Sequence, residues 1–349
     1  MGREAQDQRR RVAPRLLDVA ERAGVSLATA SRALSGSEGV SQVLAEHVRS
    51  VAEEMGYVAN PHARTLAGGT TSVAGLLVYE VGDPYFAEIA NGVVGVAAKH
   101  GWSVQVGHTE RRASAEAVQI RLMRAQRVGV IVMAGSGYVD PAMEAETARE
   151  LRTYEEGGGR VVVVGRHHLP ADAVLPDNVG GGQAVAEHLL DLGHRHLAVA
   201  AGPEHLTTTD DRLSGIRAAL AAAGLDPAGL AVVHASFTRE GGRDAVRRIL
   251  AEHPATTAIL ALNDAMATGV VSALRERGIS VPQDVSVTGF DDIQVAQDLA
   301  PALTTVRLPM SEMGSAALEL ALRPPAARPR RRRLGSELVV RDSTAAPRR

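Results

Sequence analysis

The sequence predicts an α/β protein in which a short helical N-terminal segment precedes two doubly wound parallel β-sheets. Three observations support this: a helix-turn-helix pattern near the N-terminus, alternating strand and helix patterns from Ser72 onward, and a division of that alternation at Asp177-Asn178. Such alternation is typical of parallel sheets, because helices connect their successive strands. At 349 residues the chain is long enough for two substantial cores and a small helical unit.

Residues 16–34 have the pattern of two short helices joined by a tight turn. The apolar positions expected to face the core from the first helix are Leu17, Val19, Ala20 and Ala23. Gly24 supplies the backbone freedom that the end of this helix requires. Val25 is placed to pack at the corner, and Ser26 is a suitable N-cap for the second helix. This arrangement is the one that delivers a helix into the major groove of DNA.

The outer face of the second helix is small and polar. It carries Leu27, Ala28, Thr29, Ser31 and Arg32. A helix that reads DNA needs such a face, since its first residues approach base edges while hydroxyl and arginine side chains contact phosphates. An ordinary helical hairpin with a solvated face is the alternative, but the turn glycine, the N-cap and the polar face occur together here. We expect Leu27, Ala28 and Arg32 to read bases. Phosphate contacts are expected from Ser26, Thr29 and Ser31.

A third helical pattern extends from Val40-Ser41 to Gly56-Tyr57. Its apolar positions are Val43, Leu44, Val48, Val51, Ala52 and Met55. Together with the segment Asn60–Ala67, these features resemble the headpiece and hinge helix of the LacI/GalR family of bacterial transcriptional repressors. The chain departs from the family pattern at Leu44-Ala45, where the family usually has Thr-Arg, and at Val58-Ala59, where it often has Arg-Pro.

The resemblance implies a helix-turn-helix headpiece at residues 1–60, a hinge helix and linker at 61–70, and a two-lobed periplasmic-binding-protein-like domain at 71–349. It also implies a homodimer on palindromic operator DNA, since two headpieces discriminate more bases than one. In the hinge we expect Ala63 and Leu66 to contact DNA, with Leu66 inserted between base steps in the minor groove, as the family's matching leucine is. Packing of Leu66 beneath the first lobe is the alternative.

The composition is that of a globular protein, with 45% hydrophobic residues, no cysteine and a net charge of -2. No apolar run approaches the roughly 18 residues of a membrane span. Residues 1–17 lack the apolar core of a secretory signal, so we expect a cytoplasmic protein that does not bind membranes. The net charge argues against a general nucleic-acid coat but permits a local DNA-contacting surface.

From Ser72 onward, short apolar runs predict strands at 73–78, 102–106, 128–133, 161–164, 196–200, 230–234, 258–262 and 285–288. Intervening helices are expected, among them 85–100, 178–192, 213–223, 242–251 and 265–277. By the family resemblance, the first lobe would contain residues 72–168 and 300–324. The second lobe would contain the middle segment and a final strand at 336–341. The run Arg330–Arg333 is expected to be a solvated loop.

Small molecules bind doubly wound sheets at the carboxyl ends of the strands, so the side chains near those ends are candidates for an effector site. The candidates are Tyr85, Phe86, Ser136, Arg166, Arg212, Phe237, Asn263 and Asp291. The family resemblance implies that Arg212 fixes the effector through paired hydrogen bonds and that Phe237 packs on it. Carboxylate and amide groups suit the vicinal hydroxyls of a sugar. Core packing is the alternative for Tyr85, Phe86 and Phe237. Asp264 and Asp292 are also placed to bind sugar hydroxyls, and helix capping is the alternative for them.

Motifs for catalysis are absent from the sequence, which has no GxSxG, no P-loop and no histidine pair with metal-ligand spacing. His167-His168 and the pair His194 and His196 are expected to be structural or solvated. Gly180–Gly182 lacks the strand context of a phosphate-binding loop. Two classes of function remain, a ligand-regulated transcription factor and a solute-binding or sugar-processing module of the same fold. The headpiece and hinge favour a DNA-binding repressor controlled by a sugar-like effector, without enzyme activity, cofactor or metal.

Overall fold

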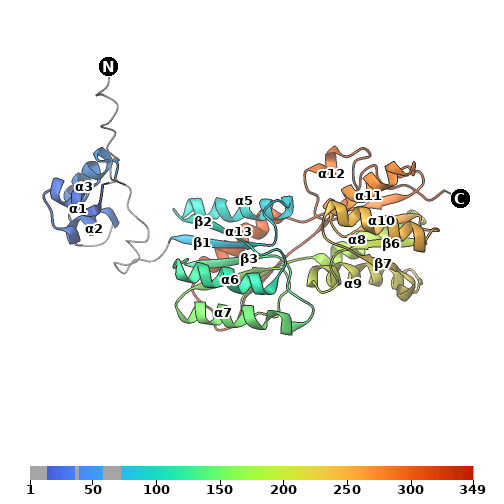
Figure 1. Ribbon diagram of the computed structural model, residues 1–349, viewed down its shortest axis with the longest axis horizontal. Coiled ribbons are helices and arrows are strands. Elements are labelled where there is room, and N and C mark those ends of the chain that lie inside the picture. The colour runs from blue at the N-terminus through green and yellow to red at the C-terminus, as the bar shows by residue number, and fades with distance from the viewer. Residues whose placement is uncertain (1–13, 36–38, 58–71, 349) are drawn as a thin grey trace, which may run out of the picture. The chain divides into compact units, whose positions relative to one another are not determined.

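The computed structural model describes residues 14–35, 39–57 and 72–348. The chain divides into two compact units, Met1–Ser72 and Val73–Arg349 (Figure 1). The predicted hinge and linker at 61–70, with Ala63 and Leu66, lie outside the described residues.

The N-terminal unit contains the helices α1 (Leu16–Arg22), α2 (Leu27–Ser35) and α3 (Gln42–Glu54). Their buried side chains form one small core built largely from alanine and valine. Gly24 has a φ of +66°, as the predicted turn requires. Two apolar assignments were wrong, because Leu17 and Val43 are exposed. Leu16 packs on the core instead of Leu17, since position 16 shares the helix face of positions 19, 20 and 23.

The first lobe of the C-terminal unit is built on a six-stranded parallel sheet with the order β11-β5-β4-β3-β1-β2. Its strands are β1 (Val73–Val78), β2 (Ser103–His108), β3 (Val130–Ala134), β4 (Arg160–Val164), β5 (Asp172–Pro176) and β11 (Arg331–Leu334). The helices are α5 (Pro84–Lys99), α6 (Ala113–Ala125), α7 (Ala145–Glu156) and α13 (Met310–Leu322). Helices α5 and α13 pack together on one face of the sheet, and α6 and α7 on the other.

The second lobe has a four-stranded parallel sheet with the order β7-β6-β8-β9. Its strands are β6 (Leu197–Ala201), β7 (Ala231–His234), β8 (Ala258–Ala261) and β9 (Ser286–Thr288). The helices are α8 (Asn178–Asp191), α9 (Thr207–Ala222), α10 (Arg239–Glu252), α11 (Asp264–Glu276) and the short α12 (Val295–Asp298). Helix α8 packs on α9, and α10 on α11. Strands β10 (Thr305–Arg307) and β12 (Glu337–Val339) form an antiparallel pair at this lobe.

Within residues 72–348 the chain passes between the lobes after β5, after β10 and after β11. More than one crossing was predicted, but the boundaries differ. Strand β5 joins the first sheet through β4, so that lobe extends past the expected end at His168. Strand β10 pairs with β12 and therefore belongs to the second lobe, although residues from 300 onward were assigned to the first.

The run Arg330–Arg333 is not a solvated loop, because Arg331–Leu334 forms the edge strand β11, parallel to β5. Strand pairing uses backbone groups, so it is compatible with charged side chains at an exposed edge. Acidic partners reduce the charge: Arg330 lies beside Asp172, and Arg332 beside Glu312 and Glu319.

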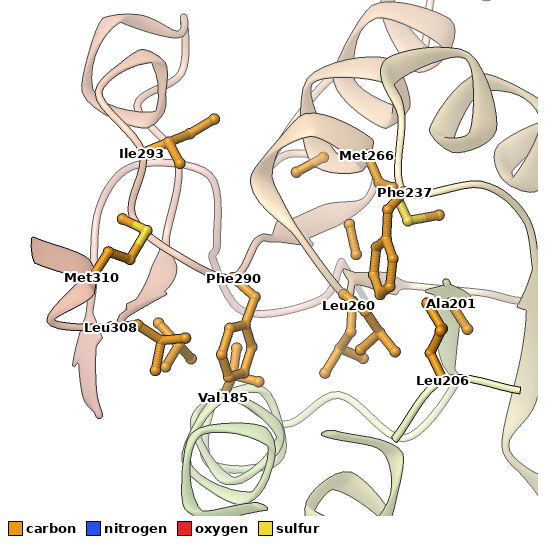
Figure 2. Packing of buried hydrophobic residues seen from close by; sticks show 14 of the residues in the cluster. Val185, Ala201, Leu206, Phe237, Leu260, Met266, Phe290, Ile293, Leu308 and Met310 are labelled. Atoms are coloured by element: carbon orange, nitrogen blue, oxygen red, sulfur yellow. The ribbon is translucent and has the colours of Figure 1, made fainter. Parts of the chain in front are cut away.

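Close helix packing explains the glycine run Gly180–Gly182, which lacks the context of a phosphate-binding loop. Gly182 faces the backbone of Arg212, and Gly215 faces the backbone of Val179, so α8 and α9 approach each other backbone to backbone. Gly181 leaves space for the ring of Phe290. Figure 2 shows this ring beside the helix that carries Val185. The glycines therefore fix the position of Arg212 in the second lobe.

Substitutions at two glycines of α5 would show how tightly α5 packs in the first lobe. A Cβ atom at Gly92 would collide with the backbone of Ser311 in α13, whereas one at Gly95 would meet open space. We expect Gly92→Ala to lower the free energy of unfolding by about 1–3 kcal/mol through overpacking. Gly95→Ala should raise it by about 0.5–1 kcal/mol through helix propensity. Urea unfolding of both variants measures this, and equal effects would contradict the proposed packing.

Candidate functional site

Two hydroxyl groups organise the start of α2. The Ser26 hydroxyl accepts a hydrogen bond from the Thr29 backbone N–H at 3.1 Å, so Ser26 is the N-cap that the sequence predicts. The Ser26 and Thr29 hydroxyls also lie 2.8 Å apart. Their expected contacts with phosphate stay a prediction.

Leu27 is 48% exposed although it is a large apolar residue. Ala30 and Ala33, on the opposite side of α2, are buried in the core of the unit. Ala28 and Arg32 are exposed as well, and the Arg32 Nε atom donates to the Ala28 carbonyl at 3.3 Å. The exposed side of α2 thus carries the three residues expected to read bases.

In the C-terminal unit, a cavity lies between the two lobes, and we call it the cleft cavity. It is lined by Tyr79, Asp83, Tyr85, Phe86, Arg111, Gly135, Ser136, Leu206, Thr208, Arg212, Phe237, Asn263 and Asp291. Most of these residues follow the carboxyl ends of strands in the two sheets, where ligands of such folds bind. Its volume is about 40 Å³, counted as the space open to the centre of a water molecule.

Arg212 dominates the second-lobe wall of the cavity. Its Nε atom donates to Asn178 Oδ1 at 2.9 Å, and its Nη2 atom donates to Asp291 Oδ1 at 2.8 Å. Its Nη1 atom donates to the Leu262 carbonyl. The guanidinium also lies 3.7 Å from the centroid of the Phe290 ring. Three of its five N–H groups are therefore committed, and the buried guanidinium is held in one orientation.

Asp291 completes this wall in an unusual backbone conformation, with a φ of +106°. A non-glycine residue in this region costs about 1–3 kcal/mol and persists only where its surroundings enforce it. Here the Asp291 backbone N–H donates to the Val306 carbonyl at 2.7 Å. Burial raises the pKa of Asp291 to about 7, although the charge of Arg212 acts in the opposite direction.

The first-lobe wall combines aromatic rings with a second arginine. Asp83 caps α5 by accepting from the Tyr85 N–H at 3.0 Å, and burial raises the pKa of its carboxyl group. Arg111 lies 3.6 Å from Asp83 and 3.1 Å from Glu80. The Tyr85 and Phe86 rings meet edge to face with centroids 5.0 Å apart. Arg111 also lies 6.0 Å from the Phe237 ring, so it contacts the opposite lobe.

Seven of the eight predicted residues line the cleft cavity: Tyr85, Phe86, Ser136, Arg212, Phe237, Asn263 and Asp291. Arg166 does not line it and instead forms ion pairs with Asp210 and Asp211. Phe86 and Phe237 are also buried members of the core, so core packing holds for them, and their packing on a ligand stays a prediction.

The two capping assignments were wrong. Asn263 caps α11 through the Met266 N–H at 2.9 Å, while Asp264 is buried and accepts from Ile293 and Thr305. Asp292 caps no helix and is held by Arg307 and Arg341.

Six lining residues were not among the predicted site residues: Tyr79, Asp83, Arg111, Gly135, Leu206 and Thr208. Tyr79 directly follows β1 and Asp83 lies in the loop after it, so the rule that ligands bind at strand ends could have identified both. Leu206 and Thr208 were missed because α9 begins at Thr207, earlier than the predicted Leu213. Arg111 follows β2, and its φ of +55° could not be anticipated for a non-glycine residue.

The histidines have structural partners, as expected. His167 Nδ1 lies 2.7 Å from Glu144 Oε1, and its Nε2 lies 2.9 Å from the Gly135 carbonyl. His194 contacts the hydroxyls of Thr257 and Ser286. Within residues 14–35, 39–57 and 72–348, no group of three or more His, Asp and Glu side chains could hold a metal ion. In the same ranges, no helix has the length and apolar character needed to cross a membrane.

The raised pKa of Asp291 predicts a specific pH dependence of stability. Its ordinary value is 3.8 and its folded value about 7, so the folded state binds more protons between these values and loses stability as the pH rises through them. From about pH 5 to about pH 8 this loss should amount to about 2–3 kcal/mol. Asp291→Asn should remove that part of the pH dependence. Urea unfolding of both proteins across this range measures the difference, and parallel pH profiles would contradict it.

Comparison with known proteins agrees with both units. Residues 15–60 match the family model described as bacterial regulatory proteins, lacI family, and residues 186–344 match a periplasmic binding protein-like domain. The transcriptional regulator DegA of Bacillus subtilis is 32% identical over 95% of this chain and 98% of its own. The transcriptional repressor CytR of Escherichia coli is 30% identical over 97% of this chain and 98% of its own.

Solved structures give the same relationship. The Lac repressor dimer bound to operator and the anti-inducer ONPF is 26% identical, with a TM-score of 0.82 over 96% of this chain and all of that one. The CelR–cellobiose complex is 30% identical, with a TM-score of 0.70 over 95% of this chain and 99% of that one. The helix-turn-helix unit, the two-lobed unit and these full-length relatives together show that the chain belongs to the lacI family of bacterial regulatory proteins.

Proposed function

We propose that this lacI-family regulator is a repressor whose affinity for operator DNA is controlled by a small uncharged sugar bound in the cleft cavity. The main observation in favour of an effector in this cavity is the buried Arg212–Asp291 pair, which lines the cavity together with aromatic residues of the opposite lobe. Such a combination suits a sugar, since paired polar groups bind hydroxyls and rings pack on the apolar face.

The charges of the cavity favour an uncharged ligand. Arg212 is paired with Asp291, and Arg111 is paired with Asp83 and Glu80. A phosphorylated ligand or a carboxylate would have to compete with these carboxylates for each arginine. A neutral ligand instead donates hydroxyl protons to the carboxylates and accepts from the guanidinium N–H groups that remain.

The size of the ligand is proposed from a relative. The cavity of about 40 Å³ holds only about three or four waters, so a sugar of any size requires the lobes to part. A regulator of Enterococcus faecium has been solved with bound ribose; it is 25% identical, with a TM-score of 0.70 over 79% of this chain and all of that one. This relative supports a ligand of monosaccharide size.

For DNA binding, we propose a headpiece at 1–60, a hinge at 61–70 and an effector-binding and dimerising domain at 71–349. Leu27, Ala28 and Arg32 would read bases, while Ser26, Thr29 and Ser31 would contact phosphates. Ala63 and Leu66 would contact the minor groove. Support comes from the exposure of Leu27 and from the capped first turn of α2.

We further propose a homodimer that binds a palindromic operator. Strand β2 is one edge of the first-lobe sheet, and α5 and α6 both pack against it. These three elements carry four exposed apolar side chains, Val94, Val106, Val118 and Leu122. A second copy that covered this edge would bury apolar surface and protect the edge strand.

Effector binding would act on DNA affinity through the lobes. A ligand that contacts both walls favours their closed arrangement, and only such differential binding can shift a conformational equilibrium. We propose that the protein has no catalytic activity and acts where its DNA partner lies, in the cytoplasm. The relatives named as transcriptional regulators support this assignment.

The effector proposal predicts a difference between two adjacent carboxylates. Asp291 lines the cleft cavity, whereas Asp292 is held by Arg307 and Arg341 outside it. In a thermal-shift screen, an uncharged monosaccharide should raise the Tm of the wild-type protein and of Asp292→Asn. Asp291→Asn should lose about 1–3 kcal/mol of binding free energy, because its one oxygen still accepts from Arg212 while an amide NH2 group, which cannot accept, replaces the oxygen open to a ligand hydroxyl. Stabilisation by sugar phosphates alone, or an unchanged response of Asp291→Asn, would refute the assignment.

The DNA proposal predicts different effects for two kinds of change in α2. Replacing Leu27 and Ala28 together should alter the sequence recovered when the protein selects from random DNA, since base contacts specify. Ser26→Ala should weaken binding to all sequences about equally, at a cost of about 1 kcal/mol, because a cap or phosphate contact carries no base information. Recovery of the wild-type site by the Leu27 and Ala28 double variant would show that other residues read the operator.

A further inference from the structure

We infer that Arg166, Asp210 and Asp211 form an ion-pair latch between the two lobes that positions the first turn of α9 at the cleft cavity. The role of Arg166 is to position other residues, since it does not itself line the cavity. The geometry of the latch is independent of the proposed function. Only the inference that the latch serves a ligand site rests on that function.

The latch joins residues from different lobes. Arg166 follows β4 of the first lobe, and the two aspartates lie near the start of α9 in the second. The Arg166 Nε atom donates to Asp211 Oδ1 at 2.9 Å, and its Nη2 atom donates to Asp210 Oδ2 at 2.7 Å. One guanidinium thus engages two carboxylates through separate N–H groups, a geometry that a lysine could not reproduce.

Backbone hydrogen bonds continue the contact between the lobes. The Thr207 N–H donates to the Gly137 carbonyl at 3.0 Å, and the Val139 N–H donates to the His205 carbonyl at 2.9 Å. The Thr207 hydroxyl donates to the Arg166 carbonyl at 2.7 Å. Thr207 is the first residue of α9, so its N–H has no acceptor within the helix.

The residues next to the latch on both lobes line the cleft cavity. Leu206 and Thr208 line the second-lobe side, and Arg212 directly follows Asp211. On the first-lobe side, Gly135 and Ser136 line the cavity next to Gly137. Holding α9 against residues 137–139 therefore fixes the distance between the polar groups that the two lobes present to a ligand.

An ordinary surface ion pair is the competing interpretation, and such pairs contribute little to stability. Arg121 provides a matched control within the same protein. Its side chain is 40% exposed, against 39% for Arg166, and it also contacts two carboxylates, those of Glu146 and Glu150. All three of these residues belong to the first lobe, so the Arg121 pair cannot hold the lobes together.

Native-state hydrogen exchange of the full-length protein without ligand tests the latch. The Thr207 and Val139 amides report separation of the lobes, and the Ile131 amide in β3 reports opening of the first-lobe sheet. We expect Arg166→Ala to accelerate exchange at Thr207 and Val139 by about threefold or more, with Ile131 unchanged. Arg121→Ala should accelerate neither reporter. Added salt should speed both reporters in the wild-type protein but not in Arg166→Ala, because the latch is partly exposed and therefore screened.

Unchanged exchange at Thr207 and Val139 in Arg166→Ala would overturn the latch, as would acceleration of all three amides alike. Because no ligand is present, these outcomes leave the effector proposal standing. Conversely, a sugar screen without any thermal shift would refute the effector proposal and leave the exchange result intact.

Discussion

The Arg212 guanidinium joins α9, which carries it, to three other parts of the second lobe, and the geometry of the cleft depends on it. It reaches α8 through Asn178, the end of β8 through the Leu262 carbonyl, and the segment after β9 through Asp291 and the Phe290 ring. A buried charge that loses its partner costs several kcal/mol, so these segments cannot separate cheaply. The close packing of α8 on α9 allows this arrangement, since Gly182 and Gly215 leave no side chain between the helices.

Two features of the cavity follow from this arginine. Asp291 remains in a strained conformation because Arg212 and the Val306 carbonyl hold its side chain and backbone. Its carboxyl group is the partner of a buried cation and, in the proposed function, would also accept a hydrogen bond from the ligand. The other arginine, Arg111, is likewise committed to carboxylates while its charge lies near the rings of Tyr79 and Phe237. In the proposed function, a cavity whose cations are already paired would favour hydroxyl groups over anions.

The lobes are connected by two kinds of interaction with different sensitivities. Inside the cleft, the polar groups are buried and little affected by salt. At its margin, Arg166 and two aspartates form a partly exposed bridge that salt weakens. In the proposed function, the first set would bind the effector and the second would adjust the readiness of the lobes to close. Both act on the start of α9, which carries Thr208 at the cavity and Arg212 beyond it.

Local signals in the sequence were sufficient for the fold class, the order of most strands and helices, the capped turn of the N-terminal unit and most of the seven predicted residues at the cavity. These signals are apolar runs, helix caps, glycine at a turn, and the rule that ligands bind at strand ends, while the family resemblance supplied the role of Arg212 and the choice of Phe237. The strand Arg331–Leu334 could be assigned only from the structure, because its pairing with β5 uses backbone groups that side-chain patterns do not report. The partners of Arg166 likewise could be identified only from the structure. The position of Arg166 after a strand predicts a cavity residue. In the folded protein, however, α9 places two carboxylates of the opposite lobe beside Arg166, and its guanidinium pairs with these.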